Sequence, residues 1–195
     1  GFTLNDNRTP IEENDIPDII ASYKNRHNED NTDRKAKHFF VEADEIRQNG
    51  YDLSINKYKE VVFCGFGEPT ERIDVLLKVA RYVKDTFNKP TRINTNGLGN
   101  LVCGRDITPE LKGLIDTVSI SLNTPNKERY HELVRSRFGD ISYDAMLDFA
   151  KEAVKYVPNV VMTTVETTIT HEEEKECQAI CDRLGVKYRI RPFED

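Results

Sequence analysis

The sequence predicts an α/β fold with about five parallel strands, preceded by a small appendage that is mostly helical or irregular. From Glu60 onward, short runs of β-branched and apolar residues alternate with amphipathic stretches of helical period, which is typical of strand–helix–strand units in a parallel sheet. Before that point only 18 of 60 residues are apolar, and the polar run NRHNEDNTDRK fills residues 25–35. We therefore expect an appendage over residues 1–57 and an α/β domain over residues 58–195.

The appendage is expected to hold two short helices. The first covers residues 16–24, with Asp15 as its cap and Pro17 in its first turn. The second begins at Ala43 and ends near Gly50. Because the appendage has few apolar residues to bury, we do not expect it to fold stably by itself.

The α/β domain is expected to contain five strands separated by helices. The strands are short apolar runs bounded by turn-forming residues, at 61–66, 91–96, 117–122, 159–166 and 186–193. The helices are expected at 71–87, 108–114, 126–135, 143–157 and 172–184. Connections of this length suit right-handed crossovers, and five such strands form either an open sheet or an incomplete barrel.

Composition and charge exclude several classes of function. A net charge of −6 argues against a protein that grips nucleic-acid phosphates through a basic face. No apolar run is long enough for a transmembrane helix, and the first ten residues lack the pattern of a signal peptide. We therefore expect a cytoplasmic location and no membrane partner. Since the chain does not begin with Met, we also expect it to start inside a longer reading frame.

The four cysteines are expected to be reduced thiols. Cys177 and Cys181 lie four residues apart on one face of the expected helix 172–184, where small buried core residues are common. A metal site would need two further ligands beside them. The sequence also shows no P-loop, no zinc-binding spacing and no Ser-His-Asp set.

Polar residues follow the first three expected strands, at the ends where parallel α/β folds bind their ligands. After the first strand, Gly65-Phe66-Gly67-Glu68 combines two glycines, which let a backbone approach a ligand closely, with a fixed negative charge. Asn96 ends the second strand, and Ser121 and Asn123 end the third. Each of the two glycine-containing segments, GFGEP and NTNG, is by itself equally compatible with a plain turn. Together, in order, they favour a site for hydroxyl, amine and carboxylate groups of a small ligand.

The segments FCGFGEPT, TRINTNG, SISLN, ERYHELVR and NVVMTTVE, taken in series, resemble the radical S-adenosylmethionine (radical SAM) superfamily. More narrowly, they are similar to the radical SAM proteins associated with TatD-type hydrolases. The resemblance runs from about Tyr58 to the C-terminus. It implies a partial (β/α) barrel of the radical SAM type, with S-adenosylmethionine (SAM) and a [4Fe–4S] cluster as the family's cofactors.

The resemblance also implies roles for the residues at the strand ends. Residues 65–68 correspond to a Gly-Gly-Glu motif, which holds the amino group of the methionine moiety of SAM. Asn96 would lie in the wall of the SAM pocket, and Ser121 and Asn123 match positions that commonly contact the ribose. Arg135 is the candidate for the methionine carboxylate, because a planar guanidinium suits that group.

One departure from the family pattern concerns activity. In the superfamily, three cysteines in a C-x₃-C-x₂-C run hold the cluster that injects one electron into SAM. No such run exists here, since Cys64 and Cys103 lack the spacing and Cys177 and Cys181 lie in another segment. The cluster carries out the chemistry that the protein only positions. We therefore expect no metal site, no catalytic residue and no activity of this chain alone.

Residues 1–60 carry a second resemblance. The blocks GFTLNDNRTPIEENDIPDII and HFFVEADEIRQNGYDLSINKYKE are similar to the C-terminal tail of the modification (N6-adenine methyltransferase) subunit of type I restriction systems. This implies an alternative function as an interaction module, with the specificity subunit or DNA as partner. It implies no methyltransferase chemistry, because the Asn-Pro-Pro-aromatic motif is absent. A chain of this kind would join two unrelated fragments.

A third interpretation is a Rossmann-type methyltransferase, which also binds SAM. The run FCGFG at a strand end superficially resembles the first motif of that fold. The fold usually places an acidic ribose ligand after the second strand, whereas NTNG stands there in this chain.

Overall fold

The structure is a computed structural model, and it describes residues 20–21, 23–24, 39, 41–48, 51, 59–64 and 67–193. The chain divides into two units, Gly1–Asn56 and Lys57–Asp195. The boundary expected from the sequence, between residues 57 and 58, lies one residue further along the chain.

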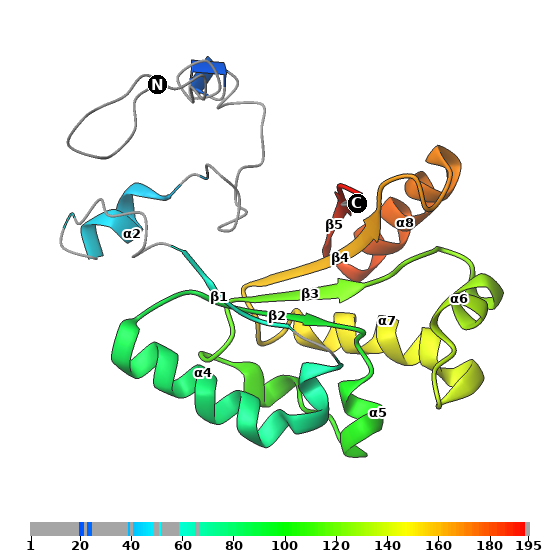
Figure 1. Ribbon diagram of the computed structural model, residues 1–195, viewed down its shortest axis with the longest axis horizontal. Coiled ribbons are helices and arrows are strands. Elements are labelled where there is room, and N and C mark those ends of the chain that lie inside the picture. The colour runs from blue at the N-terminus through cyan, green and yellow to red at the C-terminus, as the bar shows by residue number, and fades with distance from the viewer. Residues whose placement is uncertain are drawn as a thin grey trace, which may run out of the picture. The chain divides into compact units, whose positions relative to one another are not determined.

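A five-stranded parallel sheet forms the centre of the second unit (Figure 1). Its strands are β1 (Val61–Phe63), β2 (Thr91–Thr95), β3 (Thr117–Ser121), β4 (Asn159–Val165) and β5 (Lys187–Arg191). They pair in the order in which they occur in the chain, and each pair is parallel. This confirms the α/β class and the partial barrel. The Rossmann-type interpretation is wrong, because that fold needs a point at which the strand order reverses.

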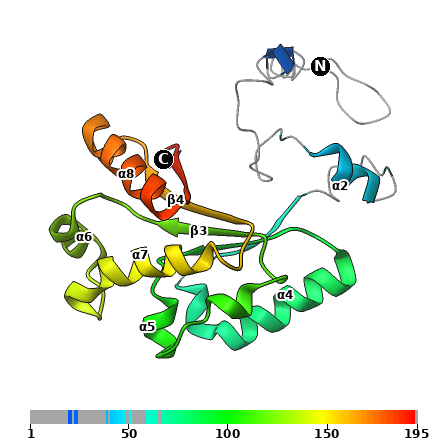
Figure 2. The same ribbon diagram turned by 180° about the vertical axis from the view of Figure 1, so that it is seen from behind.

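Helices connect the successive strands. They are α4 (Ile73–Phe87), α5 (Gly99–Cys103), α6 (Lys127–Val134), α7 (Ser142–Ala153) and α8 (His171–Leu184), with short 3₁₀ segments η1 (Pro69–Arg72), η2 (Thr108–Leu111) and η3 (Gly139–Ile141). Both views show α4, α5 and α7 on one side of β2 and β3 (Figures 1 and 2). On the opposite side of β2 and β3, which these three helices do not cover, polar strand residues are expected.

Four of the five expected helices are confirmed to within a few residues, and the fifth requires a correction. The segment 108–114 forms only the 3₁₀ turn η2, because Lys112 has a ψ of 124° and Gly113 a φ of 72°, and neither is compatible with a continuing helix. The sequence does not predict α5. That helix starts at Gly99, and the side chain of its N-cap residue, Leu98, makes no capping hydrogen bond, so the usual start signal is missing.

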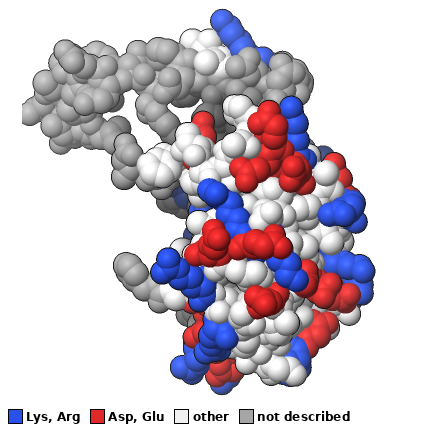
Figure 3. All heavy atoms as spheres, turned by 90° about the vertical axis from the view of Figure 1, so that its right-hand side faces the viewer, with Lys and Arg blue, Asp and Glu red and all other residues white. Residues whose placement is uncertain are grey.

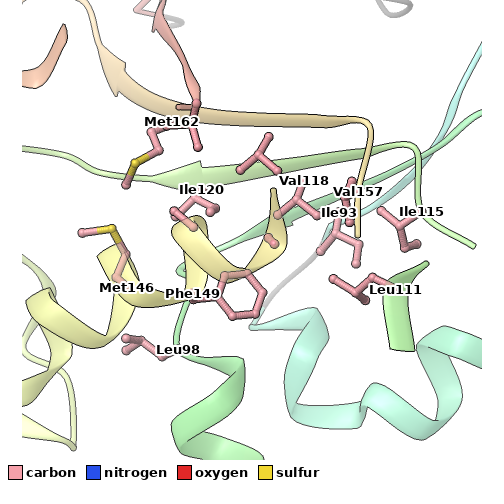
Figure 4. Packing of buried hydrophobic residues seen from close by; sticks show 14 of the residues in the cluster. Ile93, Leu98, Leu111, Ile115, Val118, Ile120, Met146, Phe149, Val157 and Met162 are labelled. Atoms are coloured by element: carbon pink, nitrogen blue, oxygen red, sulfur yellow. The ribbon is translucent and has the colours of Figure 1, made fainter. Parts of the chain in front are cut away.

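The hydrophobic core lies between the sheet and the helices (Figure 4). Ile93 of β2, Ile120 of β3 and Met162 of β4 point into it and are at most 1% exposed. Met146 and Phe149 of α7 face these strand residues and are equally buried. The core is therefore formed by alternate strand residues and one stripe of each helix, as the sequence periods predict.

The opposite face of the sheet is largely polar. The strand register aligns Asn94 with Ser119 and Ser121 with Thr163 on the side away from Ile93 and its partners. Because successive strand residues point to opposite faces, these side chains lie side by side on that face of neighbouring strands. Thr95, the last residue of β2, alternates with Asn94 and is buried on the side of Ile93.

In the first unit, the described residues include the helix α2 (Ala43–Gln48), which begins where the sequence predicts. Asp44 and Arg47 form an ion pair on its exposed surface. Residues 20–21 and 23–24 are also helical, within the expected helix 16–24, whose other residues lie outside the described part of the chain.

Among the residues that the structure describes, no helix combines the length and apolarity needed to cross a membrane.

Helix α8 has a well-defined start and a buried face. The Thr170 hydroxyl accepts a hydrogen bond from the backbone N–H of Glu173 at 3.2 Å, and the Glu173 carboxylate accepts one from the backbone N–H of Thr170 at 2.8 Å. Cys177 and Cys181 are buried in the core, as predicted, and burial raises the pKa of each thiol to about 12. Both are protonated at neutral pH.

Candidate functional site

The strands β2 and β3 point toward the side of the molecule that faces the viewer in Figure 3. Basic and acidic side chains are interspersed over this face, and its described part shows no broad area of one charge. A ligand at the strand ends must therefore be recognised by individual groups. This agrees with the acidic composition, which argues against binding through a basic surface.

Glu68 connects the ends of β1 and β2. Its Oε1 accepts hydrogen bonds from Thr95 Oγ1 at 2.6 Å, and from the hydroxyl and backbone N–H of Thr70 at 2.7 and 3.1 Å. Its Oε2 accepts one hydrogen bond, from the backbone N–H of Asn96 at 2.8 Å. Among the described residues, Oε1 therefore receives three donors and Oε2 only one, so Oε2 is the less occupied oxygen of the carboxylate. Four donors from two segments thus fix the orientation of a negative charge.

The local sequence explains why Glu68 takes this position. Glu68 is the N-cap of η1, Pro69 occupies the first turn, and the side chain of Thr70 is fully buried. Gly67, the residue immediately before Glu68, has a φ of 124°, a conformation that residues with a Cβ rarely adopt. Gly65 and Phe66, the other two residues of the predicted motif, lie outside the described residues.

Asn96 and Gly97 form the turn that follows β2. Asn96 Oδ1 accepts a hydrogen bond from the backbone N–H of Leu98 at 2.9 Å, which is a side-chain-stabilised turn. Gly97 has a φ of 77°, and a Cβ at this position would lie 2.9 Å from Cγ of Met146. The turn therefore packs directly against α7, and Asn96 lies half-buried beside Glu68.

A tight turn centred on Asn123 follows β3. Asn123 has a φ of 65°, and the backbone N–H of Thr124 donates to the carbonyl oxygen of Leu122 at 2.8 Å. Asn tolerates this left-handed conformation better than most residues, and such strain concentrates at functional sites. The N–H groups of Leu122 and Asn123 both donate to the carbonyl of Thr163 on β4. The turn is thus fixed to the next strand, and Ser121 and Asn123 remain half-buried.

Arg135 is not at a strand end. It follows the last residue of α6 with a φ of 47°, and its side chain is exposed. Its Nε donates to the carbonyl oxygen of Glu132, in its own helix, at 3.3 Å. Among the hydrogen bonds of the described residues, none joins Arg135 to Glu68 or Asn123. The structure therefore brings Glu68 and Asn96 into contact and leaves Arg135 apart from them.

A groove of about 340 Å³ lies beside Glu68. Most of its wall is apolar and comes from β1 and from one side of α4, with Phe63, Val75 and Val79 among its lining residues. Of the predicted site residues that the structure describes, Gly67 and Glu68 line it. Because Ser121 and Asn123 do not, this groove is distinct from a pocket that spans the three strand ends.

Comparison with known families assigns the fold. The family model of the radical SAM superfamily matches residues 23–184. The chain belongs to this superfamily. The match also covers part of the first 60 residues, whereas the likeness to TatD-associated proteins and the likeness to a restriction-system subunit stay predictions.

Two known proteins to which the chain is similar are both longer than it. The probable dual-specificity RNA methyltransferase RlmN 1 of Protochlamydia amoebophila (strain UWE25) is 26% identical over 145 residues, which are 69% of this chain and 39% of that protein. The crystal structure of Streptococcus suis SuiB bound to S-adenosylmethionine aligns with a TM-score of 0.52 and 18% identity, over 77% of this chain and 32% of that one. At this identity, the second comparison shows the fold alone. The chain spans less than half of either protein.

The described residues do not fit the [4Fe–4S] cluster that radical SAM membership implies. Such a cluster needs several thiolates at one place. Cys177 and Cys181 are buried, protonated thiols of α8, Cys103 Sγ contacts the carbonyl oxygen of Thr70 at 3.9 Å, and Cys64 is exposed. In the described part of the chain, no group of three or more His, Cys, Asp or Glu side chains is arranged to hold a metal ion. These residues support no reaction step through a cluster.

Sequence reasoning missed three residues around Glu68. Thr70 and Thr95 donate hydroxyl hydrogen bonds to its carboxylate, and burial, together with the charge of Glu68, raises the pKa of Tyr130 on α6, which is fully buried. The two threonines lie inside the segments FCGFGEPT and TRINTNG, but no sequence pattern distinguishes them from the other polar residues there. No sequence signal distinguishes Tyr130 from an ordinary core residue.

Proposed function

We propose that residues 58–195 are the SAM-binding part of a radical SAM barrel in the cytoplasm, and that this chain alone is catalytically inactive. The observation that carries the proposal is the Glu68 carboxylate, which four donors hold in place, only one of which reaches Oε2 among the described residues. The α-ammonium group of SAM is a suitable further donor to that oxygen, since hydrogen bonds between charged groups are the strong ones.

The adjoining strand ends supply groups for the rest of the ligand. The register pairs Thr95 with Ile120, so Asn96 and Ser121 come next on neighbouring strands. Ser121 and Asn123 offer half-buried polar side chains to the ribose hydroxyls, and Gly65, Phe66 and Gly67 remain our candidates for contact with the methionine moiety. The exposed guanidinium of Arg135 remains our candidate for the methionine carboxylate. Membership of the superfamily, and the fold shared with the SAM-bound SuiB structure, support SAM as the ligand, whereas the role of each residue is our proposal.

The proposed inactivity rests on the cysteines. Without three thiolates at one place the chain cannot hold the cluster that supplies the electron. RNA methylation, which the name of the RlmN relative states, is not part of this proposal, because the chain spans 39% of that protein.

The proposal keeps residues 1–57 as a separate appendage, which the division into two units supports. The alternative function, an interaction module for a restriction specificity subunit or DNA, depends on sequence blocks that lie mostly outside the described residues. No contact of a described residue favours it, so we do not develop it further.

Equilibrium binding of SAM to the full chain tests the proposal. We expect measurable binding by the wild-type chain, and binding at least about tenfold weaker by Glu68→Gln, because a hydrogen bond to a charged group contributes about 1.5–3 kcal/mol. Glu110→Gln is the matched control, since it removes the same charge from an exposed ion pair with Arg105. The proposal fails if the wild-type chain does not bind SAM, or if both variants bind it equally well.

A further inference from the structure

Thr95, the last residue of β2, forms two hydrogen bonds through its single side-chain oxygen. Its Oγ1 accepts a hydrogen bond from the backbone N–H of Gly97 at 3.0 Å and donates one to Glu68 Oε1 at 2.6 Å. The backbone N–H of Gly97 can only donate, so the one hydroxyl proton of Thr95 is left for the carboxylate. The chemistry of the three groups therefore fixes the direction of both hydrogen bonds.

The Thr95 side chain has little freedom to leave this arrangement. It is 4% exposed, and its β-branched shape restricts rotation about χ1. The turn that it contacts is also fixed, since a Cβ on Gly97 would lie 2.9 Å from Met146 Cγ and 3.1 Å from Ile120 Cγ2. Thr95 thus connects the Glu68 carboxylate to the packed core of the α/β unit.

The other hydroxyl donor to Glu68, Thr70, belongs to the same short segment as Glu68 itself. Both its hydroxyl and its backbone N–H donate to Oε1 within η1, where Glu68 is the N-cap. A cap of this kind forms within one stretch of chain and does not require β2. Among the hydrogen bonds of the described residues, that of Thr95 is the one by which a side chain of another element reaches Glu68.

We propose that Thr95 is a positioning residue of the Glu68 site, whose hydroxyl occupies Oε1 and so leaves Oε2 to receive the cationic amine end of the bound ligand. The inference rests on the proposed SAM function and deepens it, because it identifies a residue by which the site favours ligands with an amino-acid end. Thr95 acts only through Glu68. Its effect on binding should therefore require both the carboxylate and the amine of the ligand.

Binding of two adenosine compounds to the full chain tests the inference. SAM carries the amino-acid end, whereas 5′-methylthioadenosine has the same nucleoside and a thioether without it. We expect Thr95→Val, which keeps the shape of the side chain and removes its hydroxyl, to weaken SAM binding about tenfold and to leave 5′-methylthioadenosine binding unchanged. Thr95→Ser retains the hydroxyl and should bind SAM nearly as well as the wild type does.

A double-mutant cycle and a matched control separate positioning from a merely structural role. In a Glu68→Gln background, Thr95→Val should cause little further loss of SAM affinity, because the hydroxyl acts through the carboxylate. Thr108→Val is the control, since Thr108 is also fully buried and its hydroxyl donates to the Asp106 carboxylate at 2.7 Å. It should lower the melting temperature, as Thr95→Val does, and leave the binding of both compounds unchanged.

Three results would each overturn the inference and leave the proposed function standing. They are equal weakening of both compounds by Thr95→Val, an undiminished loss from Thr95→Val in the Glu68→Gln background, and a loss from Thr95→Ser as large as that from Thr95→Val. If the wild-type chain binds no SAM, the inference and the proposed function fall together.

Discussion

Replacing Gly97 by Ala should lower the unfolding free energy of the α/β unit, although the change adds only one methyl group. Two costs arise from the geometry. A φ of 77° costs a residue with a Cβ about 1–2 kcal/mol. The new Cβ would also lie 2.9 Å from Met146 Cγ and 3.1 Å from Ile120 Cγ2, and overpacking of this kind costs about 1–3 kcal/mol. The sum is about 2–5 kcal/mol of unfolding free energy.

Urea denaturation followed by circular dichroism measures this loss, and Gly113→Ala provides the matched control. Gly113 has a similar φ of 72°, but a Cβ there would meet nothing within 4 Å. Its replacement should cost only the backbone part, about 1–2 kcal/mol. If the two variants lose the same unfolding free energy, the turn after β2 does not pack against α7 and β3 as described, and the reasoning is refuted.

Two other predictions concern thiols and a histidine. At pH 8, Cys64 should react quickly with Ellman's reagent, whereas Cys177 and Cys181 should react only after urea is added. The reason is that both are buried and their pKa is about 12. Fast reaction of all four thiols in the folded chain would contradict this. The hydrogen bond that His171 Nδ1 donates to the Glu174 carboxylate raises the pKa of His171 above its ordinary value of 6.5, despite the opposing dipole at the start of α8. The pair therefore stabilises the fold fully below pH 6.5 and less as the pH rises through the raised pKa. An NMR titration in which Glu174→Gln leaves the His171 pKa unchanged would show that the pair does not form.

The strands were predictable because each is a short apolar run between turn-forming residues, and β1, β2, β3 and β4 begin at the residues expected for them. Two helical segments were not predictable, for opposite reasons. In 108–114 the helical pattern of the side chains is interrupted by the backbone of Gly113, whose positive φ depends on its tertiary setting. In α5 the helix is too short to show a period.

The candidate site was predictable in its position and not in its connections. Glu68 and Asn96 each follow a strand, and parallel strands bring such residues to one edge. The donors to Glu68 could not be identified from a period, because Thr95 is separated from it by a whole helix of the chain. Arg135 was selected for the chemistry of its side chain alone, and its place after α6 depends on how that helix ends.

The consecutive strand order has a consequence for how this chain behaves at high concentration. Each outer strand of the described sheet, β1 and β5, has one neighbour, and a bare strand edge invites pairing with other molecules. β1 is only three residues long, and β5 carries Lys187, Arg189 and Arg191 at alternate positions. The short length of β1 at one edge and the like charges of β5 at the other both discourage such association. Self-association should therefore increase with ionic strength, as salt screens the repulsion between the cationic edges of two copies.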